Sequence, residues 1–465
     1  MVKSTVLIAA QRFGLGARPG DLGKIGDARG WLEHQVSASY KAPPETAQLT
    51  DSATILAAYV KARKDRRDAK KDGGDPVKQV ANTIREEILP HYLAQVEART
   101  RIAATTEQPF RERLVYFWTN HFAVSVDKPV VSGIAGSFEN EAIRPHVTGH
   151  FADLLLAVEQ HPAMITYLDN EFSIGPNSKL AALARRRPRA ANRKVDINEN
   201  LGREILELHT LGVDGGYTQA DVTSFAKVLT GWSVGGGEGR LAEGKPGAWH
   251  YRDNAHEPGT HTVLGAQYKE SGESQGKAVL HDLARHPSTA RHLATKLARH
   301  FIADDPPAES VDRIAKAYTA SDGNLKKVYA ALIAEDAAWN PAPAKYKTPY
   351  EFVTSSLRAL AIEPPEGRKL VASCETLGQR TYSPGSPAGW PDTARDWDGA
   401  DALMKRVEWS LAFADRTAAL RDARQVASDV LGDSVSPATA RALGRAESNS
   451  QALALLLMSP EFQRR

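Results

Sequence analysis

Residues 196–232, DINENLGREILELHTLGVDGGYTQADVTSFAKVLTGW, decide the fold because they specify a pair of helices with marked ends. Asp196 and Glu199 have the spacing of a capping box, which predicts a helix that begins here and continues to about Thr210. Gly212 supplies the left-handed residue on which such a helix stops. The stretch therefore predicts a first helix that ends just before a glycine-rich turn.

A second helix is predicted immediately after this turn. Thr218 and Asp221 repeat the capping-box spacing, and Gly231 ends the helix before Trp232. Apolar residues recur at helical spacing between these ends and form a stripe that we expect to be buried, namely Val222, Phe225, Ala226 and Leu229. The stretch 196–232 is thus expected to form a helical hairpin.

The rest of the chain has the same helical periodicity, with apolar residues three and four positions apart. Alternating strand patterns are nearly absent, and 260–264 is the best strand candidate. We therefore predict an all-α fold with at most a few short strands. Three stretches have the composition of long loops, namely 62–76, 185–194 and 235–259.

Composition excludes several classes of protein. The 465 residues include one cysteine, so no disulfide framework or multi-cysteine metal site is possible. No apolar run approaches the roughly 20 residues that span a bilayer. We expect one large helical domain over 1–465; an alternative is a soft boundary near 265–285.

Charge and the amino terminus point to neither nucleic acid nor export. The net charge is +3, and the basic run 185–194 contains no aromatic residue for base stacking, so no nucleic-acid partner is expected. The apolar run 6–10 is shorter than the core of a secretion signal. We expect a cytoplasmic protein whose first helix lies here, with export of a trimmed chain as the alternative.

The first helix of the hairpin carries a polar stripe. Asn200, Arg203, Glu204 and Glu207 fall on one face if the helix is regular. Two carboxylates this close divide acid and base roles when Arg203 keeps one ionised and an apolar wall protonates the other. The alternative is a surface face or a structural ion network.

Two aromatic clusters are further site candidates. In 117–122, FWTNHF, Trp118 and His121 share a helix face, and His121 is either a core residue or a proton carrier that lines a pocket. In the proline-containing loop 389–397, Trp390 and Asp392 combine an indole face with a carboxylate. That combination is typical of sugar binding; a loop anchored by its tryptophans is the alternative.

These segments resemble the DUF1800 family, a bacterial family without an assigned function. The resemblance extends over nearly the whole chain in the stretches RFGLGARPGD (12–21), FWTNHF (117–122), NENLGREILELHTLGVDGGYTQADV (198–222), LTGW (229–232), HEPGTHTVLG (256–265), ATKLARHFIADDPP (294–307), KTPYEF (347–352) and GWPDTARDW (389–397). It implies a helical fold but no reaction and no catalytic residues. Members are often encoded beside a sulfatase-like family, DUF1501, which implies a partner or a shared substrate.

The first functional hypothesis is a hydrolase or lyase that acts on a polysaccharide or another cell-envelope glycan. Glu204 would be the general acid and Glu207 or Asp221 the base, with Arg203 and Asn200 orienting the substrate. Three tryptophans would form the sugar platform, namely Trp118, Trp232 and Trp390, with His121 and Asp392 beside them.

Two alternatives belong to other classes. In the first, the protein is a non-catalytic binding or assembly protein that works with a DUF1501-like partner, and the polar stripe holds helices in register. In the second, His121, His256 or His261 serves as a ligand of a metal or a haem. The spacing around His209 lacks the second histidine of a zinc signature, so no metal pair of Glu204 with His209 is expected. The first hypothesis includes no metal site and no cofactor.

Overall fold

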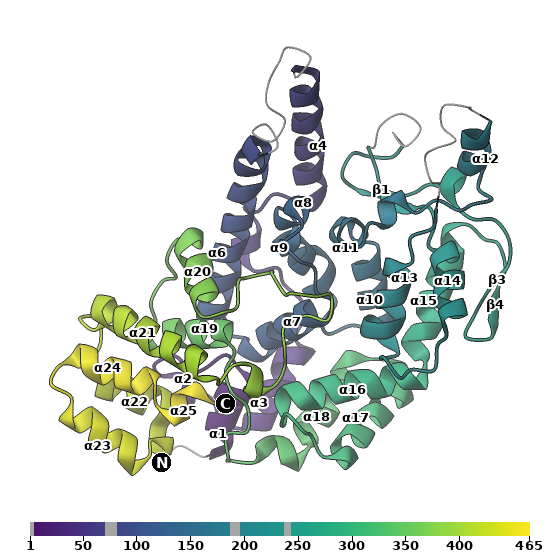
Figure 1. The fold of residues 1–465 in the computed structure, drawn as a ribbon. Coiled ribbons are helices and arrows are strands. Elements are labelled where there is room, and N and C mark those ends of the chain that lie inside the picture. The colour runs from purple at the N-terminus through teal and green to yellow at the C-terminus, as the bar shows by residue number, and fades with distance from the viewer. Residues whose placement is uncertain (1–3, 70–80, 187–195, 237–242) are drawn as a thin grey trace.

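The computed structural model describes residues 4–69, 81–186, 196–236 and 243–465. Helices make up nearly all of the secondary structure in this part of the chain, which confirms the all-α prediction (Figure 1). The strands are two antiparallel pairs of three-residue strands: β1 (Trp232–Val234) with β2 (Trp249–Tyr251), and β3 (His261–Val263) with β4 (Ala266–Tyr268). β3 lies inside the predicted strand candidate 260–264.

The amino-terminal half, up to the second helix of the hairpin, consists of short and medium helices interrupted by single π-helical and 3-10 turns. In chain order they are α1 (Ser4–Ile8), η1 (Ala9–Phe13), α2 (Asp21–Lys24), α3 (Ala28–Ser37), η2 (Pro44–Thr46), α4 (Ser52–Ala69), η4 (Ile84–Ile88), α6 (Leu89–Thr105), α7 (Pro109–His121), α8 (Pro129–Ser132), α9 (Ala135–Phe138), η5 (Glu139–Ile143), α10 (Phe151–Glu159), α11 (Pro162–Tyr167), η6 (Asn170–Phe172), α12 (Lys179–Arg185), α13 (Asn200–Glu204), η8 (Ile205–Thr210) and α14 (Gln219–Val228).

The carboxy-terminal half contains the remaining helices, with the four strands near its start. After η10 (Asp253–Ala255) they are α15 (Glu273–Arg285), α16 (Pro287–Phe301), α17 (Ala308–Ala320), α18 (Leu325–Ala334), η11 (Asp336–Trp339), α19 (Pro349–Leu360), α20 (Gly367–Thr376), η12 (Ala394–Asp396), α21 (Ala400–Thr417), α22 (Ala423–Leu431), η13 (Gly432–Ser434), α23 (Pro437–Arg445), α24 (Asn449–Leu457) and α25 (Pro460–Gln463).

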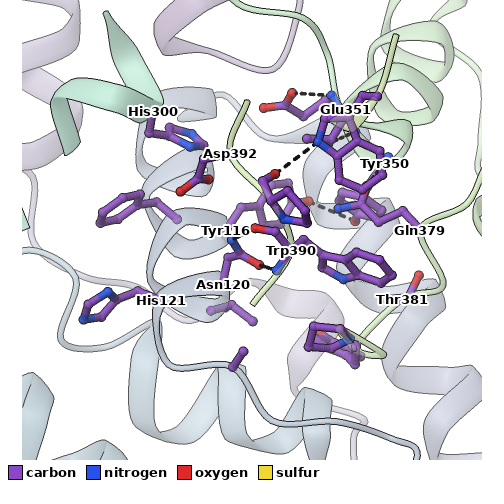
Figure 2. A pocket seen from close by; sticks show the side chains of 18 of the residues that line it. Tyr116, Asn120, His121, His300, Tyr350, Glu351, Gln379, Thr381, Trp390 and Asp392 are labelled. Atoms are coloured by element: carbon purple, nitrogen blue, oxygen red, sulfur yellow. Dashed lines mark hydrogen bonds between the residues drawn. The ribbon is translucent and has the colours of Figure 1, made fainter. Parts of the chain in front are cut away.

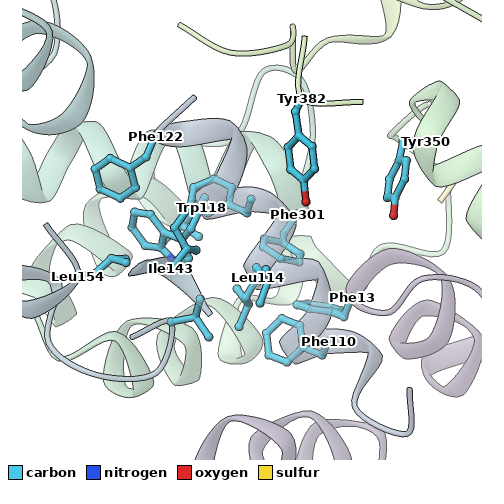
Figure 3. Close-up of a cluster of buried hydrophobic side chains, with 14 of the residues drawn as sticks. Phe13, Phe110, Leu114, Trp118, Phe122, Ile143, Leu154, Phe301, Tyr350 and Tyr382 are labelled. Atoms are coloured by element: carbon cyan, nitrogen blue, oxygen red, sulfur yellow. The ribbon is translucent and has the colours of Figure 1, made fainter. Parts of the chain in front are cut away.

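Helix α7 runs through the centre of the molecule and is buried over most of its length. One face carries large apolar residues at four-residue spacing, Phe110, Leu114 and Trp118, and the row continues to Phe122 just beyond the helix (Figure 3). Phe110 packs edge to face on Phe13, with ring centroids 5.6 Å apart. Other residues of α7, among them Tyr116 and Asn120, line a cavity.

Helix α19 is also buried, and every residue from Pro349 to Leu360 is enclosed. Thr348 and Glu351 form its capping box, in which each side chain accepts from the backbone N–H of the other residue. Arg358 is also enclosed and donates to the carbonyl oxygens of Gly16 and Ala103. These bonds tie α19 to the amino-terminal segment and to α6.

The first helix of the hairpin begins later than predicted and is less regular. Asp196 and Glu199 form no capping box, and the N–H of Asn200 instead donates to Asn198 Oδ1 at 2.9 Å. The Glu199 carboxylate is not available as a cap because Arg203 and two residues of α14 bind it. After Glu204 the chain continues as the π-helix η8, so the predicted α-helical stripe is interrupted there.

The remaining hairpin signals are confirmed. Gly212 has a left-handed φ of 86° and ends the first helix. Thr218 and Asp221 form the predicted capping box of α14. The predicted stripe on α14 is fully buried, with its members Val222, Phe225, Ala226 and Leu229 all at 0% exposure.

The loop predictions are only partly right. Helix α4 extends to Ala69, so the first part of 62–76 is helical, whereas 70–80 lie outside the described residues. Most of the basic run, 187–194, lies outside them too. The stretch 235–259 contains β2 and η10, and its residues 237–242 are not described.

The longest helices of the described residues, α4 and α21, have 18 residues each and carry many charges. No helix in this part of the chain combines the length and the apolar character that a bilayer span requires.

Alanine at Gly212 should destabilise the protein more than alanine at Gly216. Both glycines have left-handed φ angles, of 86° and 89°, so each substitution costs about 1–2 kcal/mol of backbone strain. A Cβ on Gly212 would also lie 2.9 Å from His292 Nδ1, whereas nothing lies within 4 Å at Gly216. Urea unfolding of both variants measures the difference, and equal losses would contradict the tight contact with His292.

Candidate active site: a tyrosine-lined pocket

A cavity of about 100 Å³ lies between α6, α7, α16 and α19, and the loop 379–397 forms another part of its wall (Figure 2). We call it the tyrosine pocket. Its aromatic lining residues are Tyr116, Phe117, Tyr346, Tyr350, Tyr382, Trp390 and Trp397. Its charged lining residues are Arg99, Lys296, Lys345, Glu351, Asp392 and Arg465.

Three of the residues predicted to bind substrate meet in this pocket, namely His121, Trp390 and Asp392. They come from the two aromatic clusters, 117–122 and 389–397, which are far apart in the sequence. The structure thus places residues of both segments in one cavity.

A buried ion network supports one wall. The Arg99 guanidinium lies over the rings of Tyr116, Tyr350 and Tyr382, with distances to the ring centres of 4.4, 4.5 and 4.8 Å. Its Nε is 3.0 Å from the Glu139 carboxylate, which is 1% exposed. Glu139 attracts Arg99 strongly enough to raise the pKa of this guanidinium despite its burial.

The three tyrosines around Arg99 are neutral hydrogen-bonding groups. Burial raises the pKa of Tyr116, Tyr350 and Tyr382, so none of them is a phenolate near neutral pH. The hydroxyls of Tyr116 and Tyr350 are 3.0 Å apart and share a hydrogen bond. The wall therefore offers phenol O–H groups and aromatic edges to a ligand.

Glu351, one of the two carboxylates in the lining, has a structural role. It forms ion pairs with Arg113 and with Arg465, whose Nε is 3.1 Å from Glu351 Oε1. Burial alone would raise the pKa of Glu351, but Arg465 and Arg113 hold it well below its usual range. Since Glu351 also caps α19, it stays ionised and in place.

The loop that carries Trp390 is anchored to α7 by one asparagine. Asn120 Nδ2 donates to the Trp390 carbonyl at 2.9 Å, and the Trp390 N–H donates to Asn120 Oδ1 at 2.7 Å (Figure 2). Gly389 allows this approach because a Cβ there would lie 2.2 Å from the Asn120 carbonyl oxygen. Lys345 Nζ holds the other side of the loop by donating to the Asp392 carbonyl at 2.5 Å.

His121 connects the pocket to the hairpin. It is 1% exposed, and its Nε2 lies 3.1 Å from the carbonyl oxygen of His209. Burial lowers the pKa of His121 well below its usual value, so the ring is neutral and Nε2 carries the proton that the carbonyl accepts. Nδ1 is then an acceptor, and it has no partner among the described residues.

The polar stripe of the hairpin lies outside the tyrosine pocket. Asn200 is exposed, and Arg203 Nη2 pairs with Glu199 at 2.9 Å rather than with either predicted catalytic carboxylate. Glu204 is half-buried and makes no hydrogen bond to any described residue, and burial raises its pKa, with Glu207 adding to the shift. The raised pKa favours the protonated form of the Glu204 carboxyl.

The other two predicted carboxylates are already hydrogen-bonded. Tyr217 donates its hydroxyl to Glu207 at 3.1 Å. Asp221 accepts from the N–H and the hydroxyl of Thr218 and from the N–H of Leu264. These bonds lower the pKa of Asp221 and make it a weak base.

Trp118 and Trp232 do not form part of a sugar platform. Both are at 0% exposure. Trp118 Nε1 donates to the Tyr329 hydroxyl at 2.7 Å in the core, and Trp232 packs edge to face on Trp249. Their aromatic rings complete the packing of the helices, which corrects the prediction that they contact substrate.

Two of the histidines proposed as metal ligands each place one ring nitrogen near a backbone carbonyl. His256 Nδ1 is 2.9 Å from the Thr230 carbonyl, and His261 Nε2 is 3.4 Å from the Glu257 carbonyl. Within the described ranges, no three His, Cys, Asp or Glu side chains gather as a metal site.

Several pocket residues were missed by sequence analysis. Tyr116 directly precedes the cluster 117–122, whereas Tyr350 and Lys296 lie inside the quoted stretches 347–352 and 294–307 but were not singled out. Arg99 and Lys296 lie on helices with ordinary charge patterns. No local signal distinguishes them because their role depends on contacts between distant segments.

Glutamine at position 139 should strongly destabilise the fold. Glu139 pairs with Arg99 and Arg144 and accepts from Thr119, so its loss leaves buried guanidinium charge uncompensated, at a cost of about 3–5 kcal/mol. The matched control is Asp312→Asn, which removes the exposed pair with Arg291. Urea unfolding should separate the two variants clearly, and a Glu139→Gln variant as stable as the control would refute the network's role.

Glutamine at position 204 should change how stability depends on pH. Because the pKa of Glu204 is raised above 4.5 in the folded state, that state binds more protons than the unfolded state just above pH 4.5. Wild-type stability is therefore lost as pH rises through this window, and Glu204→Gln removes the loss. The free energy of unfolding of Glu204→Gln, relative to that of wild type, should increase as the pH rises above 4.5. For Glu33→Gln, at an exposed site, the difference from wild type should not change with pH. A pH-independent difference would contradict the raised pKa.

Comparison with known proteins identifies the family but no activity. No match to the chain was found among curated proteins or among solved structures. The family model described as "Protein of unknown function (DUF1800)" matches residues 8–464, nearly the whole chain. The chain belongs to the DUF1800 family.

Proposed function

We propose that this protein is a hydrolase or lyase that acts on a polysaccharide or another cell-envelope glycan, and that the reacting sugar binds in the tyrosine pocket. One observation carries the proposal. Trp390 and Asp392 line the same cavity as the neutral phenols of Tyr116 and Tyr350. Aromatic faces suit the C–H groups of a sugar ring, and hydroxyl and carboxylate groups suit its hydroxyls.

The size of the cavity limits what enters it. A dry cavity of about 150 Å³ admits one benzene ring, and the tyrosine pocket has about 100 Å³. One substituted end of a sugar ring fits such a space, whereas several linked rings do not. The rest of the glycan would therefore remain outside the pocket.

Asp392 is the carboxylate best placed for proton transfer in the pocket. It is half-buried, and its side-chain oxygens make no hydrogen bond to any described residue. The other lining carboxylate, Glu351, is committed to Arg113 and Arg465. Asp392 is thus available as the general base or nucleophile in the bond-breaking step. The acid role of Glu204 and the roles of Glu207, Asp221 and Arg203 remain predictions for an alternative site on the hairpin, outside this pocket.

A second candidate function is a binding or assembly protein that works with a DUF1501-like partner. The polar contacts of Glu199 favour it. Its carboxylate accepts from Arg203 at 2.9 Å, from Gln219 at 2.8 Å and from Thr223 at 2.6 Å, which joins α13 to α14. Arg203 is the member of the polar stripe that joins this network, and a network of this kind holds helices in register and performs no chemistry.

A glycan panel with three variants separates these functions. Under the proposal, Asp392→Asn lowers kcat on a cleaved glycan by at least about 100-fold, since it removes the acid–base group. Asp396→Asn changes an exposed carboxylate four residues away and should leave kcat within about twofold. Glu204→Gln tests the stripe in the same assay.

Two outcomes would reject the catalytic proposal for Asp392. In the first, Asp392→Asn turns over glycan at the wild-type rate. In the second, no glycan of the panel is cleaved by a folded wild-type protein, which favours the binding function instead.

A further inference from the structure

Lys296 is a cation in the tyrosine pocket that has no bonded partner. It projects from α16, lines the cavity and is half-buried. Its ammonium group makes no hydrogen bond or ion pair with any residue that the structure describes. Burial lowers its pKa, and the attraction of Asp392 offsets only part of that effect.

Each of the other cations that line the pocket forms an ion pair with a carboxylate. Arg99 pairs with Glu139, and Lys345 pairs with Asp304. Arg465 pairs with Glu351, which Arg113 shares. Lys296 is therefore the exception among the four lining cations. Charged groups that are partly removed from water are normally paired, so an unpaired ammonium that lines a cavity is available to an anionic ligand.

Asp392 is not the ion-pair partner of Lys296. It attracts Lys296 electrostatically, but the charged atoms of the two side chains lie more than 4 Å apart and form no ion pair. Arg465 lies close enough to His300 and Lys345 to lower the pKa of both, after the larger effect of burial.

Polar atoms on two further lining residues also have no partners. His300 Nε2 and the Tyr346 hydroxyl are buried without a hydrogen bond to any described residue. Buried polar groups in native proteins are almost always satisfied, so such atoms are expected to meet a ligand or an ordered water. Both can donate to oxygen atoms.

We propose that the tyrosine pocket selects a sugar that carries a negatively charged substituent, a carboxylate or a sulfate, and that Lys296 binds this substituent. The inference deepens the proposed function and rests on it for the identity of the ligand as a sugar. The charged group lies toward Lys296, and the ring lies toward Trp390 and Asp392. The small volume of the cavity fits one such substituent and part of its ring.

The test is a binding titration with three single sugars, glucose, glucuronate and glucose 6-sulfate, followed by tryptophan fluorescence. Trp390 and Trp397 line the pocket and report occupancy. We expect glucuronate, glucose 6-sulfate or both to bind at least about tenfold more tightly than glucose, as a charge-assisted contact provides. Comparing the two anions identifies which substituent is read.

Variants assign the selectivity to one side chain. Lys296→Met should remove the preference for the anionic sugar, and Lys296→Arg should retain most of it. Lys316→Met, at an exposed lysine on α17, should leave it unchanged. Lys296→Gln provides a second neutral variant, and circular dichroism checks that each protein is folded.

The outcomes are separable from those of the glycan panel. Equal affinity for glucose and both anions, or an unchanged preference in a folded Lys296→Met or Lys296→Gln variant, would overturn the inference. Anion selectivity that depends on Lys296 supports it even if no glycan is cleaved, in which case only the catalytic proposal fails. If cleavage depends on Asp392 but binding shows no preference for the anionic sugars, the catalytic proposal is supported and the inference about Lys296 fails.

Discussion

The ion pair between Glu139 and Arg99 is the interaction on which the tyrosine pocket depends. Glu139 lies on η5, Arg99 on α6, and the Thr119 hydroxyl that also binds Glu139 lies on α7. Because an unpaired buried charge is costly, these three elements must dock in one arrangement. That arrangement places the guanidinium among three tyrosine rings and so forms a wall of the cavity.

The two sides of α7 have different surroundings, since one packs in the core and the other faces the tyrosine pocket. One side carries the apolar row from Phe110 to Phe122 into the core, and Trp118 belongs to that row. The other side presents Tyr116 to the pocket and Asn120 to the loop 379–397. A single helix thus supports the core, a wall of the cavity and the loop that supplies Trp390 and Asp392.

Local signals predicted much of the fold. The end of the first hairpin helix at Gly212 and the capping box of Thr218 with Asp221 depend on residues a few positions apart, so sequence spacing suffices. The predicted box of Asp196 with Glu199 failed because α14, which lies across the hairpin, supplies competing partners for Glu199. The π-helix η8 likewise has no spacing signature in the sequence.

The site was predictable only in part, for the same reason. Trp390, Asp392 and His121 were found because aromatic and polar residues stand together in short motifs. Arg99 and Lys296 acquire their roles from long-range packing, and Trp118 and Trp232 were misassigned because burial decides whether an indole binds a ligand or fills a core.

The most direct test of this account is hydrogen–deuterium exchange with and without glucuronate, because it shows which of the two candidate sites binds the sugar. If the tyrosine pocket is the binding site, protection should appear in 116–124, 296–300 and 379–397, while 198–207 stays unchanged. Protection confined to 198–207 would contradict the account and return the site to the polar stripe of the hairpin.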